Sequence, residues 1–303
     1  MAGVLILGGG TAGTWTANRL RRAGARVTVV DAFGDHIYQP GLLSLAFNGR
    51  SPESLRRDER SLLDAGIDLR VARVGAVNME RRRVELEGGE SLEADAIVIA
   101  TGSRLHRGDI PGLGEHGHDF YCHRRVEALQ ARLREWRGGR VVIGPARLPH
   151  KCPPVPHQFA LRFAAAFPGS EIVFVYPLPR IYPHPDVAAF FEAQFRRRGI
   201  TWMAPFVTSH VEPGRVVAAS GMELAFDLLV MVPPHRGALG EWVRVDRETL
   251  RAGERVYALG DAADLPVPKS AAAAHFQGAV VVENVLAELA GREPPARYDG
   301  RVT

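Results

Sequence analysis

A strand of apolar residues and a glycine-rich turn open the chain, Val4-Leu5-Ile6-Leu7-Gly8-Gly9-Gly10-Thr11-Ala12-Gly13. The order is strand, G-x-G-x-x-G and then a helix, which we expect from about Thr14 to Arg22. Gly8 permits the tight turn, Gly10 lets the backbone approach a diphosphate, and Gly13 lets the helix pack closely on the strand. Phosphate groups bind the unpaired N–H groups at such a helix start. The motif therefore predicts a dinucleotide site.

A second predicted strand, Arg26 to Val30, ends in Asp31. A carboxylate at this point of a dinucleotide-binding unit accepts hydrogen bonds from the adenosine ribose. A glycine motif alone would also fit a turn without a ligand. Strand, motif, helix, strand and acid in this order favour the dinucleotide site over that alternative.

Composition places the chain among soluble globular proteins. The 303 residues are 46% hydrophobic and 24% charged, which leaves room for two or three domain-sized cores. Only two of the 38 basic residues are lysines, Lys151 and Lys269. The arginines are scattered or stand at helix ends, where solvated faces explain them. We therefore expect no nucleic-acid partner.

The N-terminus and the cysteine content predict a cytoplasmic protein. A strand begins by about residue 3, which leaves no room for a signal peptide. No apolar run reaches the roughly 18 residues of a membrane-spanning helix. The two cysteines, Cys122 and Cys152, do not make a disulfide framework. In a reducing compartment they are either inert core thiols or redox groups.

The middle of the chain repeats the plan of its start. After the predicted strand Asp95–Ala100, residues 103–119 are rich in glycine, histidine and arginine and resemble a linker. A strand at Arg140–Ile143, a helix at His157–Phe167 and a strand at Glu171–Tyr176 form a second β-loop-α-β unit.

The end of the chain returns to the first domain. A strand at Val256–Leu259 runs into Gly260-Asp261, and a long helix is expected at Ala271–Ala290. The predicted fold is therefore α/β, with two Rossmann-like domains, the second inserted in the first. The expected boundaries are 1–105 plus 236–303 for the first domain and 106–235 for the second.

The second unit lacks the residues of a working nucleotide site. One glycine, Gly144, stands where a G-x-G-x-x-G would be, and prolines follow it before His157. Proline has no N–H to donate to a phosphate. The last strand of this unit ends in Tyr176-Pro177, without an acidic residue. We expect no NAD(P)H binding in this domain.

Three segments together resemble the two-dinucleotide-domain flavoproteins: the opening glycine motif, Ala100-Thr101-Gly102, and Tyr257-Ala258-Leu259-Gly260-Asp261. Two further segments, Lys151-Cys152-Pro153-Pro154 and Pro268-Lys269-Ser270, resemble the sulfide:quinone oxidoreductases and the flavoprotein subunits of flavocytochrome c sulfide dehydrogenase. The resemblance implies bound FAD, with Asp261 hydrogen-bonded to its ribityl chain. The residues expected to contact the cofactor are Gly8, Gly10, Thr11, Ala12, Gly13, Asp31, Val74, Ala100, Thr101, Gly102, Gly260, Asp261 and Lys269.

The same resemblance implies the catalytic residues. Cys152 corresponds to the cysteine on the reactive face of the flavin, and Lys151, the following helix and nearby histidines would lower the pKa of its thiol. A buried small hydrophobe is the alternative for Cys152. Lys269 would face the pyrimidine edge of the flavin and stabilise its reduced anion. Cys122 corresponds to a cysteine near the 8-methyl group, with a structural thiol or a disulfide to Cys152 as alternatives.

The sequence departs from that family at two points. Several relatives have a glutamate six residues after the cysteine, and Gln158 stands there in this chain. We expect His157 to transfer the proton instead, or the step to need no side-chain base. Relatives also have a second cysteine after a Tyr-(Asp/Asn)-Gly segment and a C-terminal domain that docks on the membrane. Here Tyr298-Asp299-Gly300 is followed by only three residues.

The expected function is oxidation of sulfide at Cys152, with electrons passing through FAD to a quinone. The partners implied are thus a small sulfur substrate and a quinone. One alternative is an FAD oxidoreductase that is NADH dehydrogenase-like or uses another sulfur compound or a soluble acceptor. Another is a flavin-binding remnant without turnover. Peripheral contact with the inner membrane, through a segment absent from this chain, and a homodimer are left open.

Overall fold

The computed structural model describes residues 3–302 and divides into two compact units. Unit 1 comprises the described residues of Met1–Ile37, Arg56–Arg104 and Arg236–Thr303. Unit 2 comprises Tyr38–Leu55 and Leu105–His235. The α/β class and the two Rossmann-like units expected from the sequence are confirmed.

One boundary differs from the expected one, because Tyr38–Leu55 belongs to unit 2. Helix α2 (Leu42–Asn48) buries Leu42, Leu43 and Leu45 in the core of that unit. The side-chain amide of Gln130 also donates to the carbonyl oxygens of Leu45 and Arg50, at 2.6 and 2.9 Å. The segment is therefore held by apolar packing and by hydrogen bonds to residues far along the sequence.

Unit 1 is built on a six-stranded sheet. In spatial order its strands are β20 (Arg251–Gly253), β21 (Val256–Ala258), β9 (Ala96–Ile99), β1 (Gly3–Leu7), β2 (Arg26–Asp31) and β5 (Asp68–Val71). All neighbours are parallel except β20 and β21. Every residue of β1 and β9 is buried. Continuous apolar strands of this kind are typical of a parallel sheet covered on both faces.

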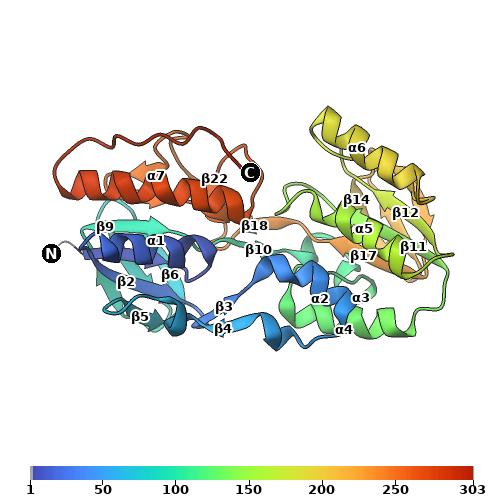
Figure 1. The fold of residues 1–303 in the computed structure, drawn as a ribbon, viewed down its shortest axis with the longest axis horizontal. Coiled ribbons are helices and arrows are strands. Elements are labelled where there is room, and N and C mark those ends of the chain that lie inside the picture. Colours follow the sequence, from blue (N-terminus) through green and yellow to red (C-terminus); the bar gives the residue numbers. More distant parts are fainter. Residues whose placement is uncertain (1–2, 303) are drawn as a thin grey trace. The chain divides into compact units, whose positions relative to one another are not determined.

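Helices from the two ends of the chain meet on this sheet. Helix α1 (Thr11–Arg22) and helix α7 (Ala271–Leu289) lie side by side (Figure 1). Gly278 permits this approach, because a Cβ there would lie 2.8 Å from the ring of Trp15 in α1. The glycine that interrupts the apolar run of α7 is thus a packing residue.

Smaller strands complete unit 1. An antiparallel sheet contains β6 (Val74–Asn78), β7 (Arg83–Leu86) and β8 (Ser91–Glu93). Two short pairs join β3 (Asp35–Ile37) to β4 (Arg56–Asp58) and β19 (Val243–Arg244) to β22 (Ala263–Asp264). Short 3-10 helices are η3 (Glu59–Leu62) and η5 (Gly260–Ala262).

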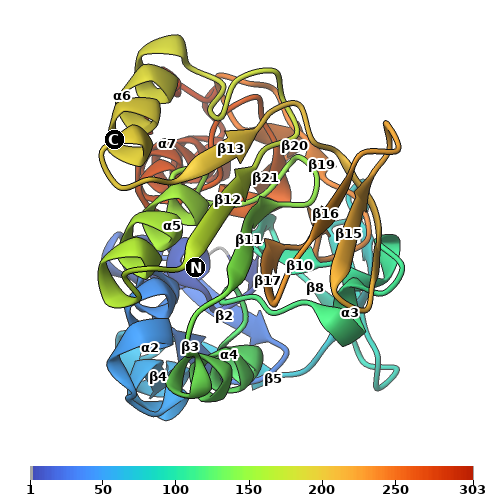
Figure 2. The same cartoon turned by 90° about the vertical axis from the view of Figure 1, so that its right-hand side faces the viewer.

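Unit 2 has a four-stranded parallel sheet in the order β13 (Thr201–Met203), β12 (Glu171–Val175), β11 (Arg140–Pro145) and β17 (Leu228–Val232) (Figure 2). Strand β11 runs two residues beyond its expected end, because Gly144 and Pro145 pair with β17. The helices with the sheet are α4 (His123–Glu135), α5 (Val155–Ala166) and α6 (Pro185–Arg196).

The remaining elements of unit 2 are shorter. An antiparallel sheet contains β14 (Thr208–Glu212), β15 (Arg215–Ala218) and β16 (Glu223–Ala225). Beside them are η1 (Gln39–Gly41), η2 (Pro52–Leu55), η4 (Arg107–Asp109) and α3 (Leu113–His116). The chain leaves unit 1 through β10 (Ser103–Leu105) and returns through β18 (His235–Gly237), and these two strands pair. Within residues 3–302, no helix has the length and apolar character needed to cross a membrane.

Candidate functional site

Two glycines of the opening turn are required by the fold itself. Gly8 has φ +103°, and a Cβ there would lie 2.5 Å from the carbonyl oxygen of Ala100. A Cβ on Gly13 would lie 1.8 Å from the carbonyl oxygen of Gly8. These contacts show that the close approach between α1, β1 and the end of β9 leaves no space for a side chain at either position.

Gly10 stands in a different environment. Its backbone, with φ −86° and ψ −173°, is open to any L-residue. An added Cβ would meet none of the described atoms within 4 Å. Gly10 is the N-cap residue and has no side chain with which to cap α1, so the first N–H groups of this helix, those of Thr11 and Ala12, remain available. Open space beside free N–H donors at a helix start fits a dinucleotide diphosphate.

Asp31 holds the turn from the side of β2. Its Oδ2 accepts a hydrogen bond from Gly9 N at 2.8 Å, and its Oδ1 accepts from Phe33 N and Gly34 N at 2.8 and 2.9 Å. The carboxylate therefore ties the glycine turn to the loop after β2. Ribose binding by Asp31 stays a prediction, and so does a cofactor contact by Val74, which pairs with Leu86.

The Gly260-Asp261 segment and Lys269 are close together in unit 1. Ser103, directly after the Ala100-Thr101-Gly102 turn, donates from Oγ to Asp261 Oδ2 at 3.3 Å. The Nζ of Lys269 donates to the Ala263 carbonyl oxygen at 2.7 Å and lies 4.1 Å from the ring centroid of Trp242. Burial lowers the pKa of Lys269, while the charges of Asp261 and Asp264 oppose that shift. The structure thus unites three segments of the predicted cofactor set.

Sequence reasoning missed a residue that orients Gly260. Gln277 in α7 is almost completely buried, and its Oε1 accepts a hydrogen bond from Gly260 N at 2.7 Å. Gly260 itself has φ +66°, and a Cβ there would lie 3.2 Å from the Cβ of Ala12. A glutamine inside an otherwise apolar helix was the available signal, since a buried amide needs a partner.

In unit 2, Cys152 lies in the loop that joins β11 to α5. Its φ of +51° is left-handed, which is uncommon for a residue with a side chain. Its carbonyl oxygen accepts hydrogen bonds from Val155 N at 3.0 Å and from the Tyr121 hydroxyl at 3.4 Å. Such backbone geometry clusters at functional sites. The neighbouring Lys151 donates from Nζ to Gln39 Oε1 at 2.7 Å.

Two tyrosines lie within electrostatic range of Cys152. Burial raises the pKa of the Tyr121 hydroxyl well above its usual value, and negative charge on Cys152 raises it further. The pKa of Tyr182 is raised by the same two causes in the same order. Both phenols therefore remain protonated at neutral pH and can act as hydrogen-bond donors.

The histidines near Cys152 do not supply the positive charge that was expected. Burial lowers the pKa of His150 to about 4 and that of His235 well below its usual value. Both rings are neutral at pH 7, so that part of the expectation is wrong. Each Nδ1 faces a carbonyl oxygen, that of Lys151 at 3.2 Å or Pro233 at 3.0 Å, and must carry the proton. Each Nε2 is then a lone-pair acceptor, without a partner in the described chain.

The proton-transfer role expected of His157 is contradicted. Its side chain is fully buried, its ring is stacked on Phe191 with centroids 4.3 Å apart, and its Nε2 lies 2.5 Å from the Ile181 carbonyl oxygen. Burial lowers its pKa to about 3. His157 is a neutral member of the aromatic core, because α5 directs it inward between α6 and the sheet.

Cys122 is the N-cap residue of α4 and is half-buried. It forms no disulfide with Cys152, so that alternative is not found in this structure. A position of Cys122 beside the flavin stays a prediction.

The loop after β11 requires glycine at position 144, since a Cβ there would lie 2.0 Å from the Val175 carbonyl oxygen. Pro154 and Pro156 then occupy the N-cap and first turn of α5, where phosphate-binding N–H groups would be needed.

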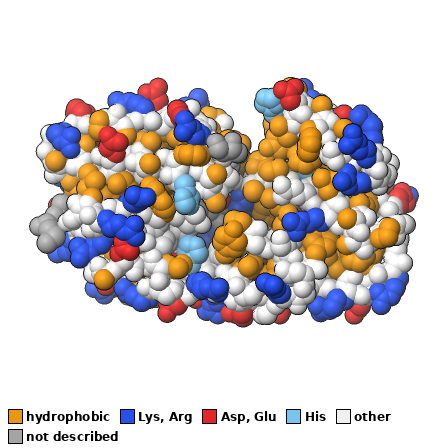
Figure 3. Space-filling model, in the orientation of Figure 1, with side chains coloured by type: hydrophobic (Ala, Val, Ile, Leu, Met, Phe, Trp, Pro, Cys, Tyr) orange, Lys and Arg blue, Asp and Glu red, His pale blue; other side chains and the backbone are white. Residues whose placement is uncertain are grey.

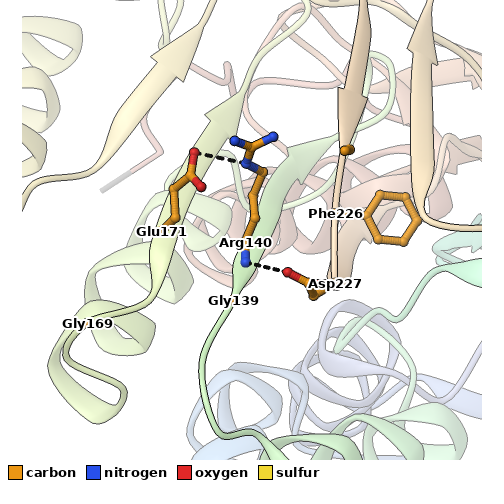
Figure 4. A pocket seen from close by; sticks show the side chains of 7 residues that line it. Gly139, Arg140, Gly169, Glu171, Phe226 and Asp227 are labelled. Carbon is orange, nitrogen blue, oxygen red and sulfur yellow. Dashed lines mark hydrogen bonds and ion pairs between the residues drawn. The ribbon is translucent and has the colours of Figure 1, made fainter.

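A hollow of about 390 Å³ lies elsewhere in unit 2. It is at the amino ends of β11 and β12, the sheet edge opposite to the Cys152 loop. Its charges are already paired: Arg140 Nε lies 2.9 Å from Glu171, and Arg140 N donates to Asp227 at 2.7 Å (Figure 4). Ligands of open α/β sheets bind at the carboxyl edge, so this hollow is not a candidate site.

Charged side chains are dispersed over the face drawn in Figure 3. Lysine and arginine side chains are mixed there with acidic ones, and they form no continuous basic stripe on that face. A nucleic-acid surface would present such a stripe.

Comparison with known proteins gives concordant matches. The family model described as pyridine nucleotide-disulphide oxidoreductase matches residues 2–278. The mitochondrial sulfide:quinone oxidoreductase of Mus musculus is 26% identical over 98% of this chain and 73% of its own length. Ferroptosis suppressor protein 1 of Taeniopygia guttata is 23% identical over 98% of this chain and 83% of its own length.

Among solved structures, the sulfide:quinone oxidoreductase of Aquifex aeolicus superposes with a TM-score of 0.86 at 18% identity. The match covers 96% of this chain and 78% of that one. At this identity the match establishes the fold. The resemblance expected from the sequence motifs is confirmed over nearly the whole chain.

Proposed function

The chain belongs to the pyridine nucleotide-disulphide oxidoreductase family, and on that premise we propose that it oxidises sulfide at Cys152 and passes the electrons through FAD to a quinone. Family membership supports an FAD-dependent oxidoreductase. The observation that carries the sulfide assignment is Cys152 itself, held in a left-handed conformation at the carboxyl edge of the unit 2 sheet, where the related nucleotide-binding units have a glycine loop.

Unit 1 holds the cofactor in this proposal. The N–H groups at the start of α1 and the open space at Gly10 receive the diphosphate, Asp31 the ribose, and Asp261 the ribityl chain. Bound FAD supplies a two-electron acceptor. Lys269, whose Nζ is anchored by the Ala263 carbonyl oxygen, provides positive charge for the reduced state.

Unit 2 supplies the sulfur chemistry. The Cys152 thiolate and hydrosulfide form an S–S bond, one S–H bond breaks, and two electrons leave for the cofactor. The released proton leaves for solvent without a side-chain base, because burial lowers the pKa of His150, His157 and His235 alike.

The alternative is an FAD oxidoreductase with another electron donor or acceptor. The match to ferroptosis suppressor protein 1 supports this alternative, because that relative aligns with 98% of this chain, the same share as the sulfide:quinone oxidoreductase of Mus musculus. A flavin-binding protein without turnover is the remaining alternative.

A steady-state assay with a water-soluble ubiquinone analogue separates these functions. Sulfide is expected to drive quinone reduction, whereas NADH is not, because the loop after β11 has prolines at the positions that would bind a second diphosphate. Quinone reduction driven by NADH and not by sulfide would establish the alternative. A flavin-containing protein that reduces the quinone with neither donor would be the remnant.

A further inference from the structure

A buried carboxylate lies against the glycine turn of unit 1. Glu59, in η3, has a side chain that is 0% exposed. A Cβ added to Gly9 would lie 3.0 Å from the carboxyl carbon of Glu59. Neither the glycine motif nor the flavin resemblance accounts for an acidic group at this point. A negative charge beside a diphosphate-binding turn opposes the ligand unless a positive charge neutralises it.

The neutralising group is His36 of β3. Its Nδ1 lies 3.0 Å from Glu59 Oε2 and 3.2 Å from the Gly9 carbonyl oxygen. Two acceptors at this nitrogen require that Nδ1 carries a proton, so titration takes place at Nε2. The hydrogen bond to Glu59 raises the pKa of His36 above its usual value, against the effect of burial. The histidine side chain is 16% exposed and can exchange that proton with solvent.

The pair is also coupled to the helix that would bind the diphosphate. The Thr14 hydroxyl, in the first turn of α1, donates to Glu59 Oε1 at 2.5 Å. Glu59 therefore lies at the positive end of the α1 dipole, the same end that attracts phosphate. With His36 protonated, the His36–Glu59 pair carries no net charge. With His36 neutral, the Glu59 carboxylate competes with the diphosphate for the positive end of the α1 dipole.

We propose that His36 and Glu59 together set the affinity of unit 1 for the FAD diphosphate, an inference that rests on the flavin of the proposed function. Protonated His36 permits tight binding, and deprotonated His36 weakens it. The stabilising charge pair is present below the ordinary histidine pKa of about 6.5 and is lost as pH rises through the higher value in the folded protein.

Other charged groups near His36 could also affect the pH dependence of FAD binding. The charge of Asp31 from β2 raises its pKa further. Arg57 is its pairing partner across β4. Asp35, its neighbour in β3, forms an ion pair with Arg56 at 2.7 Å. None of these neighbours is a histidine, the residue type whose ordinary pKa lies between about pH 6 and pH 9, so the pH dependence is assigned to His36.

The test is the dissociation constant of FAD measured as a function of pH. Holoprotein is diluted at about pH 6 and about pH 9, and released FAD is followed by its fluorescence. Wild type is expected to bind FAD about tenfold or more weakly at the higher pH, because a buried unit charge at several ångströms is worth at least that factor. The isosteric Glu59→Gln variant should bind tightly at both values.

Two further variants complete the cycle. His36→Asn, which keeps a donor near the Nδ1 position, should bind FAD weakly at both pH values, and His36→Asn combined with Glu59→Gln should recover tight binding. A Glu59→Gln protein with the same pH slope as wild type would overturn the inference. If His36→Asn fails to fold, wild type and Glu59→Gln still decide it. Absence of FAD binding at every pH would instead overturn the flavin assignment.

Discussion

A Cys152→Ser variant is expected to reduce its flavin with sulfide at least about a thousandfold more slowly than wild type, because the sulfur that forms the new S–S bond is gone. A serine hydroxyl is not ionised near neutral pH and cannot hold a persulfide. The backbone hydrogen bonds of Cys152, from Val155 N and the Tyr121 hydroxyl, do not involve the thiol and should remain. Stopped-flow absorbance of the flavin under anaerobic conditions measures the rate.

Cys122→Ser is the companion variant at the other cysteine. Cys122 is the N-cap residue of α4, and serine is a favourable N-cap residue, so the fold should be retained. If Cys122 has no part in the chemistry, its variant reduces the flavin at the wild-type rate; a slower rate would support its predicted position near the 8-methyl group. Equal rates for wild type and Cys152→Ser would show that the nucleophile is misassigned.

A Gly10→Ala variant is expected to keep its fold and lose its flavin. The backbone at Gly10 accepts alanine, and the added methyl group meets none of the described atoms within 4 Å. In the proposed holoprotein that space receives the diphosphate. We expect FAD to bind at least about 100-fold more weakly, which corresponds to about 2.8 kcal/mol. FAD fluorescence titration gives the affinity, and thermal unfolding of the protein without FAD gives the stability.

Gly13→Ala is the comparison that separates folding from binding. Its Cβ would lie 1.8 Å from the Gly8 carbonyl oxygen, so α1 must move away from the turn. Overpacking of this kind costs about 1–3 kcal/mol of stability. This variant should therefore lose both stability and FAD. An unchanged FAD affinity in Gly10→Ala would show that the diphosphate lies elsewhere.

Local sequence patterns were sufficient to predict the elements of unit 1 that form the proposed cofactor site. Strand β1, the glycine turn and α1 follow one another directly, and each glycine has a role that the motif alone defines. The same holds for Gly260-Asp261 at the end of β21. Parallel strands bring their carboxyl ends to one edge, so segments far apart in the sequence could be expected to meet.

Burial and long-range pairing were beyond sequence reasoning. His157 was expected to transfer a proton because it directly precedes Gln158, where several relatives have a glutamate, yet aromatic residues from β12 and α6 enclose it. The buried charge pair joins His36 to Glu59, and no spacing rule relates these positions. The leucines of α2 fit the pattern of either core, and only the hydrogen bonds from Gln130 and the packing assign them to unit 2.

Anaerobic titration of the purified wild-type protein tests the central claim most directly. The oxidised protein should show the flavin absorbance band, stoichiometric sulfide should bleach it, and NADH should leave it unchanged. Rapid bleaching by NADH without bleaching by sulfide would contradict sulfide oxidation at Cys152. A purified protein without any flavin band, and unable to take up FAD, would contradict the account from the glycine turn onward.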